Sequence, residues 1–159
     1  MTKIGHRPLA AIFGCSGLVL TEAERTFFNA CDPLGLILFS RNVDTPEQVR
    51  ALVSEIRSCV GRNAPVLIDQ EGGRVQRLRP PLWRSAPPMR QFGDLYYQNP
   101  PLAAKAVRAN MQAIGVELAG LGIDVDCAPC LDVPVPGAHD VIGNRALSED
   151  PAVVSFLAK

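Results

Sequence analysis

Residues 35–69 read GLILFSRNVDTPEQVRALVSEIRSCVGRNAPVLID, and this stretch decides the fold class. An unbroken apolar run stands at residues 35–39, and a second strand is expected at residues 65–69, which are apolar up to Ile68 and end on Asp69. Continuous apolar runs are typical of parallel strands that are buried on both faces. The segment between them carries apolar side chains at the spacing of a helix face. The stretch therefore predicts a strand, a helix and a second strand that lies parallel to the first. The helix face is formed by Val49, Leu52, Val53, Ile56 and Val60.

Start and stop signals define this helix and its neighbours. Thr45 is placed as the N-cap, Pro46 suits the first helical position, Gln48 is placed to close a capping box, and Gly61 ends the helix. The same reasoning predicts further strands and helices on both sides. The strands are expected at residues 8–13 and 123–128, and the helices at 21–30, where Thr21 and Glu24 form a capping box, at 101–121 before Gly122, and from 148 onward.

Four strands that alternate with helices are compatible with two architectures. One is a doubly wound open sheet, and the other is a closed (β/α)₈ barrel. A complete barrel takes about 250 residues, and the sequence of 159 residues stops inside the helix predicted after residue 148. We therefore predict an α/β fold in which residues 1–159 form one incomplete domain, the N-terminal half of a (β/α)₈ TIM barrel. Half a barrel leaves two unpaired strand edges, so we expect self-association or pairing with the missing half-barrel.

The composition narrows the range of partners. Hydrophobic residues make up 47% and charged residues 20%, and the formal net charge is zero. This balance argues against nucleic acid or an anionic membrane surface as the partner, because both favour a basic excess. No apolar run reaches the roughly 18 residues that would span a membrane, and the N-terminus does not read as a signal peptide. The five unevenly spaced cysteines predict buried free thiols in a reducing cytoplasm rather than a disulfide framework.

Polar side chains follow three of the predicted strands, at the end where parallel α/β proteins bind ligands. The most informative stretch runs from Asp69 to Arg77 and contains Gly72 and Gly73, which allow a tight turn or a close approach to a ligand. Asp69 with Arg74 and Arg77 can hold the hydroxyls of a sugar, which both donate and accept hydrogen bonds. Arg77 can instead pair with Asp69, and the stretch can also be an ordinary turn with two solvated arginines. The other two stretches are residues 40–42 and 129–132.

Several other groups of residues are weaker candidates for a functional site. Asp69 and Glu71 share one side of an extended strand, but carboxylates so close together do not easily flank a glycosidic bond. Cys127 and Cys130 have the spacing of a redox motif, although no helix is predicted to open there and no second pair completes a zinc site. His6 and His139, the two histidines, lack a nucleophile nearby. We expect no metal and no cofactor.

Four ordered blocks of this sequence resemble glycoside hydrolase family 3, in its bacterial β-N-acetylhexosaminidase branch, and together they span essentially the whole chain. The most specific block is residues 68–78, IDQEGGRVQRL. The others are LILFSRN at residues 36–42 with TPEQ at 45–48, DCAPCLDV at 126–133, and VIGNRALS at 141–148. The resemblance implies a (β/α)₈ barrel that releases terminal N-acetylglucosamine from peptidoglycan-derived sugars with retention, in the cytoplasm.

The resemblance also implies roles for single residues. Asp69, Arg77 and Arg145 match the family's substrate-binding positions. Cys130 stands where the branch carries Val or Leu, which favours a packing role. The family's acid/base histidine and nucleophilic aspartate have no counterpart here, so no catalytic residue is assigned and both are expected beyond Lys159. We therefore expect this chain alone to be inactive. Two alternatives are a truncated, non-catalytic α/β module that binds a sugar or a partner, and a thioredoxin-like domain built on Cys127 and Cys130.

Overall fold

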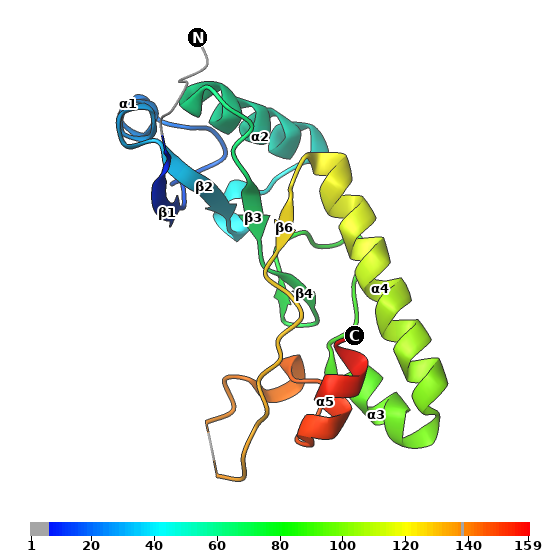
Figure 1. The fold of residues 1–159 in the computed structure, drawn as a ribbon. Helices are drawn as coiled ribbons and strands as arrows, with labels where there is room; N and C mark the ends of the chain where they lie inside the picture. Colours follow the sequence, from blue (N-terminus) through cyan, green and yellow to red (C-terminus); the bar gives the residue numbers. More distant parts are fainter. Residues whose placement is uncertain (1–6, 138) are drawn as a thin grey trace. The chain divides into compact units, whose positions relative to one another are not determined.

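The computed structural model describes residues 7–137 and 139–159 (Figure 1). The chain separates into two compact units. Unit 1 contains the residues up to Ile68 together with Leu118–Asp126, and unit 2 contains Asp69–Glu117 and Cys127–Lys159. His6 lies outside the described residues.

A four-stranded parallel sheet forms the centre of unit 1 (Figure 1). Leu36 in β2 aligns with Val66 in β3, and Leu67 in β3 aligns with Val125 in β6. The side chains of Leu36, Leu38, Val66 and Ile68 are fully buried, as the unbroken apolar runs predict. The predicted parallel α/β architecture is therefore confirmed, and the sheet of the described residues is open. Its strand order is β1 (Leu9–Phe13), β2 (Pro33–Leu38), β3 (Val66–Ile68), β6 (Val125–Asp126).

Helices α1 and α2 of unit 1 begin at the predicted caps. In α1 (Glu22–Cys31), the Thr21 side chain and the Glu24 side chain form the full capping box. In α2 (Pro46–Val60), the Thr45 hydroxyl accepts from the Gln48 amide, and Gly61 ends the helix with a φ of 70°. The Gln48 side chain does not close the predicted box, because its Oε1 accepts from the amide of Asp44 rather than that of Thr45. The five predicted core residues of α2 are all buried.

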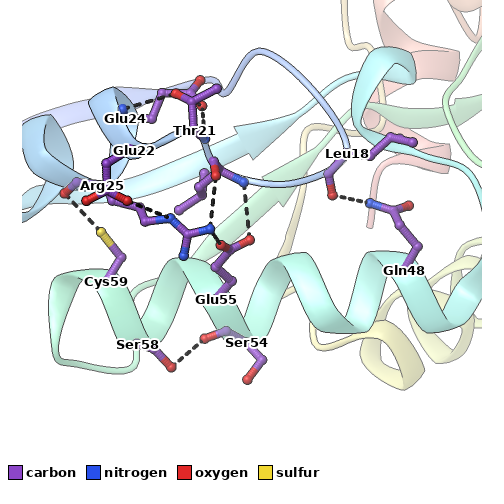
Figure 2. A network of polar contacts seen from close by, with 11 residues as sticks. Leu18, Thr21, Glu22, Glu24, Arg25, Gln48, Ser54, Glu55, Ser58 and Cys59 are labelled. Carbon is purple, nitrogen blue, oxygen red and sulfur yellow. Dashed lines mark hydrogen bonds and ion pairs between the residues drawn. The ribbon is translucent and has the colours of Figure 1, made fainter.

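Polar contacts join α1, α2 and the loop that precedes α1 (Figure 2). Arg25 on α1 forms an ion pair with Glu55 on α2 at 2.5 Å, and Glu55 also accepts from the amide of Leu20 at 3.2 Å. Gln48 donates from its side chain to the carbonyl of Leu18 at 2.7 Å. The Cys59 thiol donates to the carbonyl of Arg25 at 3.3 Å. These contacts hold the two helices and the loop against one another, so the polar side chains of this surface stabilise the fold of unit 1.

Unit 2 combines a small antiparallel pair with helices. The pair consists of β4 (Gln70–Gly72) and β5 (Val75–Gln76). The helices are α3 (Arg90–Gln98), residues 100–117 of α4 (Pro100–Leu121) and α5 (Pro151–Leu157). Buried side chains of these helices form one hydrophobic core together with Met89, which precedes α3, and Leu147, which precedes α5. The helical members of the core are Phe92, Ala103, Val107, Val153, Val154 and Leu157.

Four sequence-based expectations need correction. The stretch from Asp69 to Arg77, described from the sequence only as a turn, contains β4 and β5. Helix α3 was not predicted, because its apolar positions are few and no capping residue precedes it. The fourth strand covers only Val125–Asp126. The last helix does not run to the end of the sequence, since α5 ends at Leu157. Among the described residues, no helix combines the length and the apolar character needed to cross a membrane.

Candidate functional site

Asp69 and Arg77 form the centre of the candidate site. Asp69 follows β3 directly, and Arg77 follows β5, so the β4–β5 turn brings the two residues together. Nη2 of Arg77 donates to Oδ2 of Asp69 at 2.7 Å, and both side chains are 22% exposed. The structure thus contains the Asp69–Arg77 pair that the sequence offered as an alternative. A partly exposed carboxylate beside a guanidinium presents an acceptor and donors to the same ligand group.

Two buried glutamines hold this turn in shape. Oε1 of Gln70 accepts from the amides of Arg77 and Leu78 at 2.8 and 3.0 Å, and its Nε2 donates to the Leu78 carbonyl at 3.0 Å. Gln76 donates to the carbonyls of Leu78 and Arg84 and accepts from the amide of Ala86. A buried amide whose hydrogen bonds are satisfied fixes the backbone around it. The position of Arg77 is therefore set by Gln70 and Gln76.

The two glycines of the turn serve the packing of unit 2. Gly72 has a φ of 96°, and a Cβ at this position would lie 2.4 Å from the carbonyl oxygen of Pro87. The amide of Gly73 donates to the carbonyl of Ala86 at 2.8 Å. The close approach that the sequence suggested for a ligand is made instead by residues 86–88. Only glycine combines this φ with a backbone neighbour so near.

Glu71 and Arg145 form a second ion pair in unit 2. Nε of Arg145 donates to Oε2 of Glu71 at 2.9 Å, and Nη2 donates to Oε1 at 2.7 Å. The Glu71 side chain is only 5% exposed and that of Arg145 is 25% exposed. The hydrogen bonds that Arg145 donates to Glu71 raise the pKa of the Arg145 guanidinium above its usual range. Because both oxygens of Glu71 accept from Arg145, the weak hypothesis of an Asp69–Glu71 catalytic pair is not supported.

The contacts of Arg74 differ from those expected of a residue that holds a ligand. Its Nη2 donates to the carbonyls of Asp140 and Val141 at 2.9 and 2.7 Å. These residues precede the short 3₁₀ helix η2 (Gly143–Arg145), which carries Arg145. Arg74 therefore holds the backbone of the loop that presents Arg145. Nothing in the sequence signals this contact, since 66 residues separate Arg74 from Asp140.

The cysteine pair does not form a redox centre in this structure. Cys127 is exposed and Cys130 is buried, and neither forms a disulfide, nor do Cys15, Cys31 and Cys59. The Cys130 thiol donates to Oδ2 of Asp132 at 3.0 Å. Burial, and then the bond to Asp132, raise the pKa of this thiol, so it is a poor nucleophile at neutral pH. The packing interpretation of Cys130 is favoured, and the expectation that all five thiols are buried is wrong.

The remaining candidate stretches have structural contacts. In unit 1, the buried Asn42 donates to the carbonyls of Cys15 and Gly17. Arg41 donates to the Cys15 carbonyl and stacks on the ring of Phe39. In unit 2, His139 lines a polar cavity of about 540 Å³ together with residues that include Arg74, Asp140 and Glu149. No group of three or more potential metal ligands occurs among residues 7–137 and 139–159.

Comparisons with known proteins identify relatives across nearly the whole chain. The chain is 35% identical over 148 residues to a β-hexosaminidase of Xanthomonas oryzae, covering 93% of this chain and 43% of the relative. It is 39% identical over 145 residues to a β-hexosaminidase of Nitrosomonas eutropha, covering 90% and 40%. The chain therefore spans less than half the length of these curated relatives.

Solved structures give the same result. The chain matches NagZ from Neisseria gonorrhoeae in complex with N-trifluoroacetyl-D-glucosamine with a TM-score of 0.88 and 31% identity, over 96% of this chain and 45% of that one. It matches a family 3 β-N-acetylglucosaminidase from Paenibacillus with a TM-score of 0.82 and 30% identity, over 92% and 27%. The family model for the glycosyl hydrolase family 3 N-terminal domain matches residues 22–159. The resemblance found in the sequence is confirmed, and the chain belongs to glycosyl hydrolase family 3.

Proposed function

We propose that this chain is the sugar-binding N-terminal part of a β-N-acetylhexosaminidase that removes terminal N-acetylglucosamine with retention. The observation that carries the proposal is the Asp69–Arg77 pair, held at 2.7 Å directly after β3. The names of the relatives support the reaction class, and the N-acylated glucosamine bound to the Neisseria protein supports the substrate class.

The geometry of the pair suits a sugar hydroxyl. Oδ2 of Asp69 is engaged by Arg77, while Oδ1 accepts no hydrogen bond from any residue in the described part of the chain. A hydroxyl can donate to this carboxylate and accept from the guanidinium at the same time. Hydrogen bonds of this kind to charged groups contribute about 1.5–3 kcal/mol each. We propose Asp69, Arg77 and Arg145 as the substrate-binding residues.

We further propose that the nucleophile and the proton donor lie downstream of Lys159 in the same polypeptide. Residues 1–159 would then belong to one barrel domain that is completed by the missing half-barrel or by self-association. The substrate would be an amino-sugar fragment of peptidoglycan, processed during cell-wall recycling in the cytoplasm.

The test compares this chain with an extended protein, defined as the chain expressed together with the rest of its reading frame. Both are assayed on a chromogenic β-N-acetylglucosaminide, and the anomer first released is identified by NMR. We expect turnover by the extended protein alone, with the β-anomer as first product. Turnover by the 159-residue chain, or inactivity of both proteins, would refute the proposal. Inactivity of both would favour a non-catalytic module.

A pair of variants of the extended protein tests the binding residues. Asp69→Asn removes the charge beside Arg77 but keeps the shape, and we expect kcat/KM to fall by about ten- to hundredfold, the value of one charged hydrogen bond. Asp124→Asn is the control, because Asp124 also pairs with an arginine, Arg57, at 2.9 Å, but precedes its strand. We expect kcat/KM of the control to stay within twofold of the unaltered protein. Equal kcat/KM values for the two variants would remove Asp69 from the site.

A further inference from the structure

We propose that Glu71 is a positioning residue that fixes the guanidinium of Arg145 in the orientation needed to contact the sugar. This inference rests on the proposed function, which gives Arg145 its contact with substrate. The sequence and the family resemblance assigned no such role to Glu71. The observation behind it is the bidentate contact of a buried carboxylate with a partly exposed arginine 74 residues away.

The contact restricts the arginine strongly. Glu71 engages Nε and Nη2, so the guanidinium plane is held along one edge. Paired N–H donors of this kind give an arginine directional as well as electrostatic restraint. Because Glu71 is only 5% exposed, water competes little for the carboxylate, and an alternative rotamer of Arg145 would leave a buried charge without a partner.

The backbone around Arg145 is restrained by the same turn. Arg74 donates to the carbonyls of Asp140 and Val141, and Nη2 of Arg74 would lie 3.0 Å from a Cβ added at Gly143. Glu71 and Arg74 stand on either side of the glycine turn between β4 and β5. One short segment thus fixes the side chain of Arg145 through Glu71 and its loop through Arg74.

The restraint leaves donors for a ligand. A guanidinium carries five N–H groups, and Glu71 accepts from Nε and Nη2. Nη1 of Arg145 donates to no residue in the described ranges 7–137 and 139–159. The free edge of the guanidinium can therefore donate to a sugar hydroxyl while its other edge is held by Glu71.

The role is tested in the extended protein by a double-mutant cycle. Glu71→Gln removes the charge but keeps one acceptor, and Arg145→Gln removes the guanidinium but keeps one donor for Glu71. We expect Glu71→Gln alone to lower kcat/KM by about ten- to hundredfold, as for a lost charged hydrogen bond. In the Arg145→Gln background we expect the same change to lower kcat/KM less than twofold further, because residues that act through one another are not additive. Full additivity, or unaltered kcat/KM for Glu71→Gln, would overturn the role.

A matched control separates positioning from stability. Asp32 pairs with Arg62 at 3.0 Å, and the side chains are 5% and 25% exposed, the same values as for Glu71 and Arg145. Asp32→Asn should lower the thermal midpoint about as much as Glu71→Gln, and kcat/KM should stay within twofold of the unaltered protein. If Asp32→Asn also lowers kcat/KM tenfold, the effect of Glu71→Gln is explained by stability and the positioning role fails.

A measurement independent of activity distinguishes failure of this inference from failure of the proposed function. The Nε–H signal of Arg145 in ¹⁵N NMR should exchange slowly with water in the unaltered protein and rapidly in Glu71→Gln. If the extended protein is inactive but this difference is observed, the proposed function fails while Glu71 still orients Arg145. If the exchange rate is the same in both proteins, Glu71 does not hold Arg145, whatever the activity.

Discussion

A glycine-to-alanine substitution at position 93 gives a sharp test of the packing in unit 2. Gly93 lies in α3, where alanine would ordinarily stabilise the helix by about 1 kcal/mol. However, a Cβ on Gly93 would lie 1.7 Å from the carbonyl oxygen of Leu147. Real Cβ contacts are essentially never shorter than 3.0 Å, so the distance between these two atoms would have to increase by about 1.3 Å. The neighbour is backbone, and Leu147 itself is fully buried.

The steric effect should outweigh the helix propensity. Overpacking of a filled core costs about 1–3 kcal/mol, and a rigid carbonyl places this case at the upper end. Subtracting the propensity gain leaves a net loss of about 2 kcal/mol. Gly115→Ala in α4 is the control, because a Cβ at Gly115 meets nothing within 4 Å, and this variant should be stabilised by up to about 1 kcal/mol.

Urea unfolding of the extended protein measures both variants. We expect opposite shifts of the midpoint, downward for Gly93→Ala and upward for Gly115→Ala. Because Leu147 follows Arg145 by two residues, Gly93→Ala should also lower kcat/KM. If Gly93→Ala matches the unaltered protein in midpoint, the close packing of α3 on the segment of Leu147 is wrong.

The remaining predictions concern a helix cap, a carboxylate and two thiols. Thr21→Ala should lower the free energy of unfolding by about 1 kcal/mol in urea titrations, because it removes the capping box of α1; an unchanged midpoint would contradict the cap. Burial opposes ionisation of Glu24, but hydrogen bonds from Thr21 and Ser16 outweigh it and lower its pKa below the ordinary 4.5. Its stabilisation should therefore be complete above pH 4.5 and lost as the pH falls below that value, a loss that Glu24→Gln should abolish in unfolding curves. With a thiol reagent at pH 8, Cys127 should react within minutes and Cys130 only after unfolding; equal rates by mass spectrometry would contradict the burial of Cys130.

Much of unit 1 could be predicted because its signals are local. The apolar run before Phe39, the face from Val49 to Val60 and the glycine that ends α2 each depend on residues within one element. Hydrophobic periodicity and caps report such short-range preferences directly. Two details there were wrong. The fourth strand is shorter than predicted, and the partner of the Gln48 side chain involves a choice between two neighbouring amides that the sequence does not distinguish.

Unit 2 was predicted less well because its structure depends on contacts distant in the sequence. α3 is stabilised by packing on residues near Leu147 and by the Tyr97–Ser148 hydrogen bond at 3.0 Å, more than 50 residues away. The β4–β5 pair has too few residues for a recognisable alternation. Asp69 and Arg77 could be found because they lie eight residues apart in one turn. Glu71 could not be connected to Arg145 by spacing alone.

The block at residues 68–78 contains carboxylates with two different roles, and the sequence pattern alone does not distinguish them. Asp69 and Glu71 are both carboxylates after the same strand, yet Asp69 is 22% exposed with one oxygen available, whereas Glu71 is buried with both oxygens engaged. A buried carboxylate whose two oxygens both accept from a guanidinium is poorly placed to attack a sugar carbon. We therefore propose Asp69 and Arg77 as the ligand contacts of this block, while Glu71 and Arg74 hold Arg145 and its loop. The block at residues 68–78 therefore contains residues that hold other parts of the site in place as well as residues proposed to contact the sugar.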